Sequence, residues 1–434
     1  MQEEENKRVT FSYGIVMVRT RRGLSLMDRF AKFRITRPLS WIMLYIMPLA
    51  AALILYLIFK ELSVYLSPQG AAVAGYVRTI SPAANLLLPG LNPYVPIVYG
   101  WIAIIVAVVI HEASHGIVAR SLGLRVKYAG LVFFLIIPIG AFVELDEKEL
   151  RETKARNSLR VLAAGSGINF IVGLACLALL ILSVSAMVPA VRGVPVISVA
   201  QSTPQLPSPA YQDGIKPGEF ITAIDNIPVT DLNYTLRGSG DFQPGQAVNV
   251  TLWSDGQSTV LPVTLGKITE TVIVTNSSNV VISNKTYTYP YLGVSSITYD
   301  TLKDEVNGYV NSYKTDPALY ILPPSFPIIG NFAPSESIPF SNLLIGFYSS
   351  PLGGAASVID NLLFWLFFVN FNLALFNDLP IYPMDGGQAF ERFLVGASRG
   401  RISDSLASRI TIVVTVALVA VLFVTLAGPY LGLF

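Results

Sequence analysis

The two histidines of the chain lie four residues apart, with a glutamate directly after the first, in His111-Glu112-Ala113-Ser114-His115. This segment continues an apolar, helix-forming run, and residues i and i+4 of a helix lie on one face. The two imidazoles can therefore share one metal ion, such as Zn²⁺. Glu112 would then lie beside the metal, where a carboxylate can act as general base. The spacing predicts hydrolysis by a metal-activated water.

A catalytic zinc ion takes three protein ligands and keeps a fourth position for water, so a third ligand is needed. The chain has no other histidine and one cysteine, Cys176 in an apolar run, which leaves a carboxylate. The acidic residues after HEASH lie in a charged loop that water would solvate: Glu144, Asp146, Glu147 and Glu149. Better placed are the aspartates that flank a late apolar segment: Asp360, Asp378 and Asp385. Asp385 is the strongest candidate, because the prolines and glycines of Pro380–Gly387 break the helix and let the backbone approach a metal.

The composition of the chain is typical of a membrane protein. Of its 434 residues, 52% are hydrophobic and 13% are charged, whereas a soluble domain carries about 25% charged residues. The net charge of +2 is small and the basic residues are scattered, while nucleic-acid sites gather Lys and Arg on one face. We therefore expect the lipid bilayer as the surroundings and no nucleic acid as a partner. An ionisable residue inside a membrane helix is costly and usually marks function, which argues against histidines that merely pair with Glu112.

A helix needs about 20 apolar residues to cross the hydrocarbon core. Uncharged stretches of that order predict spans in five regions: Trp41–Phe59, Tyr94–Ile110 continuing into HEASH, Val161–Val188, a pair of runs within Ser337–Asn377, and Ile410–Leu426. The run Tyr128–Val143 is also apolar, but it is short and contains Pro138 and Gly140. We interpret it as a re-entrant segment that enters the membrane without crossing it.

The orientation follows from Lys and Arg, which stay preferentially in the cytoplasm when they flank a span. The segment before Trp41 contains nine of them, Arg120–Arg160 contains eight and Arg392–Arg409 contains four. The long segment Arg192–Glu336 has seven basic residues against twelve acidic ones. We therefore expect an integral protein of the cell membrane with a cytoplasmic N-terminus, an outer long segment and an outer C-terminus. HEASH would lie near the cytoplasmic end of its helix.

The chain divides into five expected parts: a basic cytoplasmic segment 1–40, a first membrane part 41–190, an extracytoplasmic domain 191–267, a β-rich extension 268–336 and a second membrane part 337–434. In the extracytoplasmic domain, turn residues separate short β-branched runs. Ser208-Pro209-Ala210, Gly214–Ile221 and Ile224–Val229 resemble the PDZ family over roughly Pro195–Leu265. That resemblance implies a bound peptide or C-terminus added to the sheet as a strand. A β-rich spacer without a ligand is the alternative.

Two motifs together resemble the site-2 proteases, the intramembrane metalloproteases. The paired signatures of that family are HExxH in one transmembrane helix and NxxPxxPxDG near a later one, matched by His111–His115 and Asn377–Gly386. Ile137–Val143 resembles the membrane-embedded hairpin that follows HExxH in this family. The resemblance implies a polytopic α-helical membrane protein with a re-entrant membrane β-hairpin and an extracytoplasmic, β-rich PDZ-like domain.

Site residues carry over from the family position by position. The resemblance makes His111, His115 and Asp385 ligands of Zn²⁺, Glu112 the base, and Asn377 a polar residue near the substrate backbone. Ala164–Phe170 resembles the family's GPxxN segment, with Asn169 at the position of its Asn. Ser166 replaces the usual Pro, which affects the expected helix bend rather than the role of Asn169.

The expected reaction is intramembrane proteolysis of membrane-spanning substrates. Glu112 would take the water proton and pass it to the leaving amine. Either Asn169 or Asn377 could donate to the developing oxyanion, or both could instead hydrogen-bond between packed helices. A substrate helix must unwind before attack, because its carbonyls are already hydrogen-bonded, and the strand around Ile136–Val143 could pair with the unwound chain.

Two other classes of protein compete with this interpretation. A zinc transporter also places metal ligands in spans, but it would need a relay of ligands along a path. A membrane scaffold that presents the PDZ-like domain would have no need of Glu112.

Overall fold

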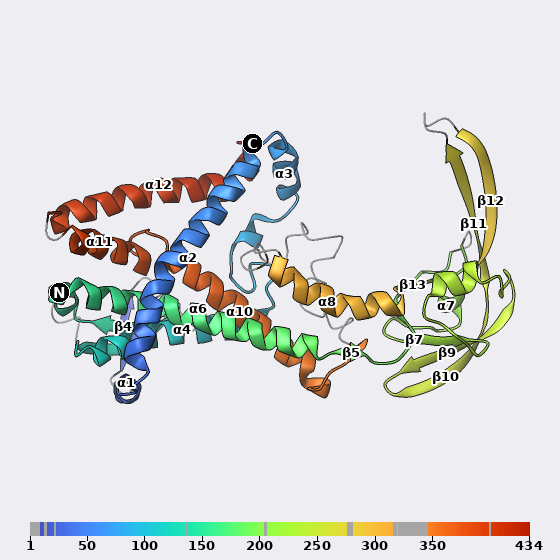
Figure 1. Cartoon of the computed structure of the whole chain (residues 1–434), viewed down its shortest axis with the longest axis horizontal. Helices are drawn as coiled ribbons and strands as arrows, with labels where there is room; N and C mark the ends of the chain where they lie inside the picture. The colour runs from blue at the N-terminus through green and yellow to red at the C-terminus, as the bar shows by residue number, and fades with distance from the viewer. Residues whose placement is uncertain are drawn as a thin grey trace. The chain divides into compact units, whose positions relative to one another are not determined.

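The fold is described from a computed structural model, which describes residues 9–12, 15–20, 23–134, 137–203, 206–275, 281–315, 319, 346–398 and 401–434. The chain forms two compact units. One comprises Met1–Leu180, Pro317–Pro334 and Asn361–Phe434, and the other comprises Ile181–Asp316 and Ser335–Asp360. The long helices and one sheet belong to the first unit, and most of the remaining strands belong to the second (Figure 1).

Helices dominate the first unit. They are α1 (Leu24–Ala31), α2 (Thr36–Tyr65), α3 (Gly70–Val77), α4 (Ile97–Ser121), α5 (Glu147–Glu152), α6 (Ala155–Ser185), α10 (Ala356–Asn377), α11 (Asp385–Ala397) and α12 (Asp404–Leu431). Within the described residues, five helices are long and apolar enough to cross a membrane: α2, α4, α6, α10 with its preceding turn, and α12. Their apolar side chains lie on all faces, as in helices that lipid or other helices surround.

Each of the five regions in which we expected spans overlaps one of these helices. The α4 helix extends the expected run through the whole HEASH motif to Ser121. In Ser337–Asn377, where we expected a pair of runs, the second coincides with α10, whereas most of the first lies outside the described residues. Polytopic architecture is therefore confirmed, with five candidate spans.

A four-stranded antiparallel sheet accompanies these helices. Its order is β1-β2-β3-β4, from β1 (Val9–Ser12), β2 (Ile15–Thr20), β3 (Val126–Phe134) and β4 (Ile137–Leu145). The β3–β4 pair covers the run that we interpreted as re-entrant, and its turn at 135–136 lies outside the described residues. The N-terminal hairpin β1–β2 joins β3 across more than 100 residues of sequence. The edge strand β4 lies against α4.

Glycines let α6 approach three neighbouring helices closely. A Cβ atom at Gly167 would lie 2.5 Å from Cβ of Met43 on α2, and one at Gly173 would lie 3.1 Å from the backbone nitrogen of Phe371 on α10. At Gly165 the neighbours are the two imidazoles of α4. The helix α6 therefore packs by its backbone against α2, α4 and α10.

A buried arginine fixes α6 to α2 near one end of both helices. Arg160 is 6% exposed. Its Nε and Nη2 donate to Oγ of Ser40 at 3.0 and 2.7 Å, and Nη2 also donates to the carbonyl of Arg37 at 3.1 Å. Its guanidinium lies 4.8 Å from the ring centre of Trp41. These contacts compensate for the cost of burying the charge.

The second unit is built on an antiparallel sheet of order β10-β9-β7-β6-β13, with β8 (Ile227–Pro228) paired to β7. The strands on this path are β6 (Val194–Val199), β7 (Phe220–Ile224), β9 (Ala247–Ser254), β10 (Gln257–Thr264) and β13 (Val294–Ser296). Its core includes Val196, Ile221, Ile224 and Val250. The helix α7 (Pro209–Gln212) and the turn η2 (Tyr234–Gly238) complete this fold.

Two further elements lie in the segment that we expected to be a β-rich extension. The strands β11 (Gly266–Thr275) and β12 (Val281–Tyr291) form a long two-stranded ribbon, which Figure 1 shows extending from the sheet. The helix α8 (Tyr299–Thr315) follows β13 and was not anticipated from the sequence. A short pair, β5 (Val188–Pro189) with β14 (Tyr348–Ser349), completes the described strands of this unit.

Candidate active site

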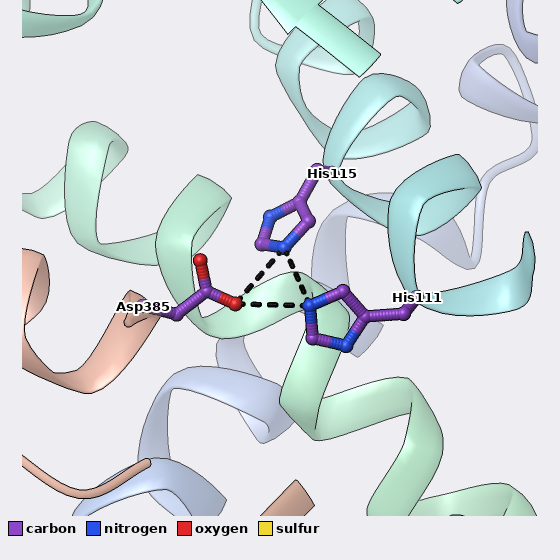
Figure 2. A group of neighbouring side chains, drawn as sticks. All are labelled: His111, His115 and Asp385. Atoms are coloured by element: carbon purple, nitrogen blue, oxygen red, sulfur yellow. Dashed lines mark hydrogen bonds and ion pairs between the residues drawn. The ribbon is translucent and has the colours of Figure 1, made fainter. Parts of the chain in front are cut away.

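His111 and His115 lie on one face of α4 and point toward Asp385 (Figure 2). The Nε2 atoms of His111 and His115 are 3.0 and 3.1 Å from Oδ2 of Asp385, and they are 3.2 Å from each other. Two ligands bound to one zinc ion at 2.0–2.1 Å in tetrahedral geometry are separated by about 3.3 Å. The three ligand atoms thus have nearly the spacing that a shared zinc ion requires.

Asp385 reaches the histidines because a tight turn precedes it. It is the first residue of α11, where the partial positive charge of a helix N-terminus stabilises a carboxylate. A Cβ atom at Gly386 would overlap the carbonyl oxygen of Asp378, and one at Gly387 would lie 2.5 Å from the backbone of Ile381. The two glycines after Asp385 therefore allow the preceding loop to fold back on the start of α11.

The protonation of the two rings tests whether a metal fits this group. Nδ1 of His115 lies 2.7 Å from the carbonyl oxygen of Val161, so it must carry the proton and donate it. In a neutral ring with its proton on Nδ1, Nε2 of His115 carries a lone pair. That lone pair faces Oδ2 of Asp385 and Nε2 of His111. Lone pairs at such distances repel each other unless a cation lies among them. The donor set therefore fits Zn²⁺.

The electrostatics of Asp385 agree with this reading. Burial alone would raise the pKa of the Asp385 carboxyl, but the charge and hydrogen bonds of the adjacent His115 and His111 lower it below its ordinary range. The group is thus a carboxylate, which requires positive charge beside it. A cation held among the three ligand atoms would supply that charge.

Asn169 contacts the outer side of the His111 ring. It is fully buried on α6, and its side-chain amide lies 3.3 Å from Nδ1 of His111. Its Oδ1 has no hydrogen-bond partner among the described residues. If the amide is turned so that Oδ1 accepts from Nδ1–H of His111, Nε2 of His111 is free to bind a metal.

The other carboxylates and the second amide that we singled out are not members of the three-residue group with metal-ligand spacing. Glu112 accepts a hydrogen bond at Oε2 from the backbone N–H of Val143 on β4, at 2.9 Å. Asn377 is half-buried at the end of α10. Asp360 and Asp378 are buried, on α10 and directly after it, and neither belongs to the group with metal-ligand spacing.

Two functional features of this site escaped the sequence interpretation. A Cβ atom at Gly165 would lie 2.5 Å from Nε2 of His111 and closer still to Nε2 of His115, so only glycine fits there. The run of small residues around Gly165 could have indicated from the sequence that another element approaches α6 closely at this position. The Val143 contact had no such signal, because a backbone N–H is present at nearly every position.

The fold and the site together define a polytopic membrane protein in which the two histidines of an HExxH motif and Asp385 have metal-ligand spacing. A profile described as Peptidase family M50 matches residues 99–422, well over half of the chain. The chain therefore belongs to peptidase family M50, the family of the site-2 proteases. The resemblance noted from the two motifs is confirmed.

Three curated relatives are each similar to part of this chain. An uncharacterized protein of Methanocaldococcus jannaschii, MJ0971, is 28% identical over 165 residues, which cover 38% of this chain and 42% of the relative. A membrane-bound transcription factor site-2 protease homolog of Arabidopsis thaliana is 26% identical over 41% of this chain and 33% of its own length. A probable periplasmic serine endoprotease DegP-like of Rhizobium meliloti is 35% identical over 65 residues, 15% of this chain and 13% of the relative. The chain thus spans less than half the length of each of these relatives.

Proposed function

We propose that this protein is an intramembrane zinc metalloprotease that hydrolyses peptide bonds of membrane-spanning substrates. The observation that carries the proposal is the convergence of Nε2 of His111, Nε2 of His115 and Oδ2 of Asp385 within 3.0–3.2 Å. Two of the ligands come from α4 and the third from α11, so the fold itself assembles the metal site. Membership of peptidase family M50 supports the same reaction.

In this mechanism, His111, His115 and Asp385 would hold Zn²⁺, which when bound would supply a Lewis acid for the scissile carbonyl and a water activated near neutral pH. Glu112 accepts the water proton and delivers it to the leaving amine. Asn169 holds the His111 ring in the orientation that binds metal, which its contact with Nδ1 favours. Asn377 then is the better candidate for a donor to the oxyanion, as its match to the family motif implies.

The membrane setting follows from the charge distribution and the five long apolar helices. The N-terminus is cytoplasmic, and the PDZ-like domain and C-terminus lie outside. The active site then opens toward the cytoplasmic side, where water is available. A substrate helix unwinds and pairs as a strand with the hairpin β3–β4, which is embedded in the membrane as a re-entrant element.

The PDZ-like domain of residues 191–267 supplies a second contact for substrates. Its antiparallel sheet and buried apolar core support a folded module rather than a linker, and the sheet and core also include β13 and Leu292 beyond residue 267. It would bind an extended peptide or a C-terminus and so select substrates before the membrane part cleaves them.

The decisive test is the Glu112→Gln protein, purified in detergent and incubated with single-span substrate proteins. Glutamine keeps the shape of the side chain but cannot accept a proton, so we expect normal zinc content and a loss of cleavage of at least about 100-fold. Undiminished cleavage by Glu112→Gln would reject the proposal. Asp385→Asn should instead lower zinc content, because an amide is a poorer ligand than a carboxylate.

The competing classes make different predictions. Among the residues that the structure describes, His111, His115 and Asp385 are the one group with metal-ligand spacing. A zinc transporter would move zinc across proteoliposomes and would need further ligands along its path. A scaffold would keep its full cellular activity after Asp385→Ala.

A further inference from the structure

Glu112 does not stand alone beside the metal ligands, because a neighbouring strand hydrogen-bonds to it. The backbone N–H of Val143 donates to Oε2 of Glu112 at 2.9 Å. We propose that this N–H holds the Glu112 carboxylate in its working orientation, which makes Val143 a positioning residue for the hydrolysis. The inference rests on the proposed role of Glu112 as general base.

Strand geometry explains why this N–H is available. β4 is the last strand of the order β1-β2-β3-β4, so within the described residues one of its edges has no partner strand. Val143 lies opposite Ala129 of β3, and its N–H points to Glu112 instead. Backbone N–H groups along an edge strand alternate between the partner strand and the open side. The open side of β4 therefore faces the catalytic helix.

Packing holds the donor at a fixed distance from the acceptor. Gly116 lies four residues after Glu112, so both are on the same face of α4. A Cβ atom at Gly116 would lie 3.2 Å from Cγ1 of Val143. The missing side chain at Gly116 thus lets the Val143 side chain rest directly on α4, while the Val143 N–H meets Glu112 one turn earlier.

The hydrogen bond leaves the chemistry of Glu112 intact. A carboxylate has two oxygens, and Oε2 accepts from Val143 while Oε1 stays free to accept the water proton. A glutamate side chain has several rotatable bonds, so an unanchored carboxylate would spend much of its time away from the metal. A hydrogen bond to a charged acceptor is strong enough to select one orientation.

The test compares two prolines on the same edge. Val143→Pro removes the N–H that meets Glu112, and proline is tolerated on an edge strand where the N–H faces outward. Ala141→Pro is the matched control, because its N–H lies two residues away on the same side of β4 but does not meet Glu112. We expect Val143→Pro to lower kcat on the order of 10- to 100-fold with zinc content and KM unchanged. Because β4 is also the strand proposed to pair with substrate, Ala141→Pro should raise KM rather than lower kcat, with the same zinc content as Val143→Pro.

A second variant keeps the test decisive if proline disturbs the strand. Replacing the amide at Val143 by an ester, through incorporation of the α-hydroxy analogue of valine, removes the same N–H and keeps the side chain. The ester protein should show the same fall in kcat. An ester protein with the kcat of the parent, or an equal fall in kcat for Ala141→Pro, would overturn the proposal. Loss of activity in Glu112→Gln together with a fully active ester protein would reject this role of Val143 while the proposed protease activity stands.

Discussion

The substitution Gly165→Ala tests the geometry of the metal centre most directly. Its added Cβ would lie 2.5 Å from Nε2 of His111, whereas ordinary contact begins at 3.4 Å, so the ring must move by about 0.9 Å. Metal–ligand distances tolerate deviations of about 0.2 Å. The two imidazoles would therefore lose their shared position, and we expect zinc affinity to fall by at least about 100-fold.

The stability of the fold should change less than zinc affinity does. The helix preference of alanine over glycine, about 1 kcal/mol, offsets part of the overpacking cost of about 1–3 kcal/mol, so we expect at most a modest fall in thermal stability for Gly165→Ala. Gly75→Ala on α3 is the matched control, because nothing lies within 4 Å of an added Cβ there. Purified proteins would be equilibrated in a zinc buffer, and bound zinc, cleavage rate and thermal stability measured on the same samples.

The result that refutes this reasoning is a Gly165→Ala protein that binds zinc and cleaves substrate within about threefold of the parent. Such a protein would mean that the imidazoles do not meet α6 as described, or that they do not hold the metal. If Gly75→Ala lost zinc as well, the effect would be a general one of glycine replacement and not of the site.

Three further perturbations distinguish the parts of the site. Asn169→Ala should weaken zinc binding by 10- to 100-fold, because it removes the group that orients His111; unchanged zinc affinity would contradict that role. Asn377→Ala should lower kcat by about 100-fold with zinc content unchanged if its amide stabilises the oxyanion, and a fall in zinc content instead would exclude it. Arg160→Ala should lower thermal stability by several degrees, because it strips Ser40 and Trp41 of their partner; a melting curve that matches the parent would show that the buried contacts contribute little.

The three residues that converge with metal-ligand spacing were predictable from the sequence because the information is local. The spacing from His111 to His115 fixes two ligands on one helix face, and scarcity of alternatives leaves a carboxylate as the third. The motif around Asp385 breaks the helix with prolines and glycines, which is a strong local signal. The five long apolar helices were predictable for the same reason, since length and hydropathy suffice.

What could not be predicted depends on contacts between distant residues. The N-terminal segment was expected to be only a basic cytoplasmic stretch, yet β2 pairs with β3 more than 100 residues later. Strand pairing of this kind leaves a weak trace in the sequence, because short β-branched runs are common. The helix α8 has a polar composition, and its apolar positions are too few to reveal it among the surrounding strands.

The three glycines of α6 have a mechanical consequence. At these glycines, Gly165, Gly167 and Gly173, the backbone of α6 itself sets the distance to the neighbouring helices α4, α2 and α10, respectively. A hydrogen-bonded helix backbone cannot change shape as a flexible side chain can. We expect α6 to act as the stationary frame of the membrane unit, against which the imidazoles keep their place through the catalytic cycle. Any opening that admits a substrate would then be a displacement of other elements relative to α6, and paired probes with one member on this helix are the natural way to record it.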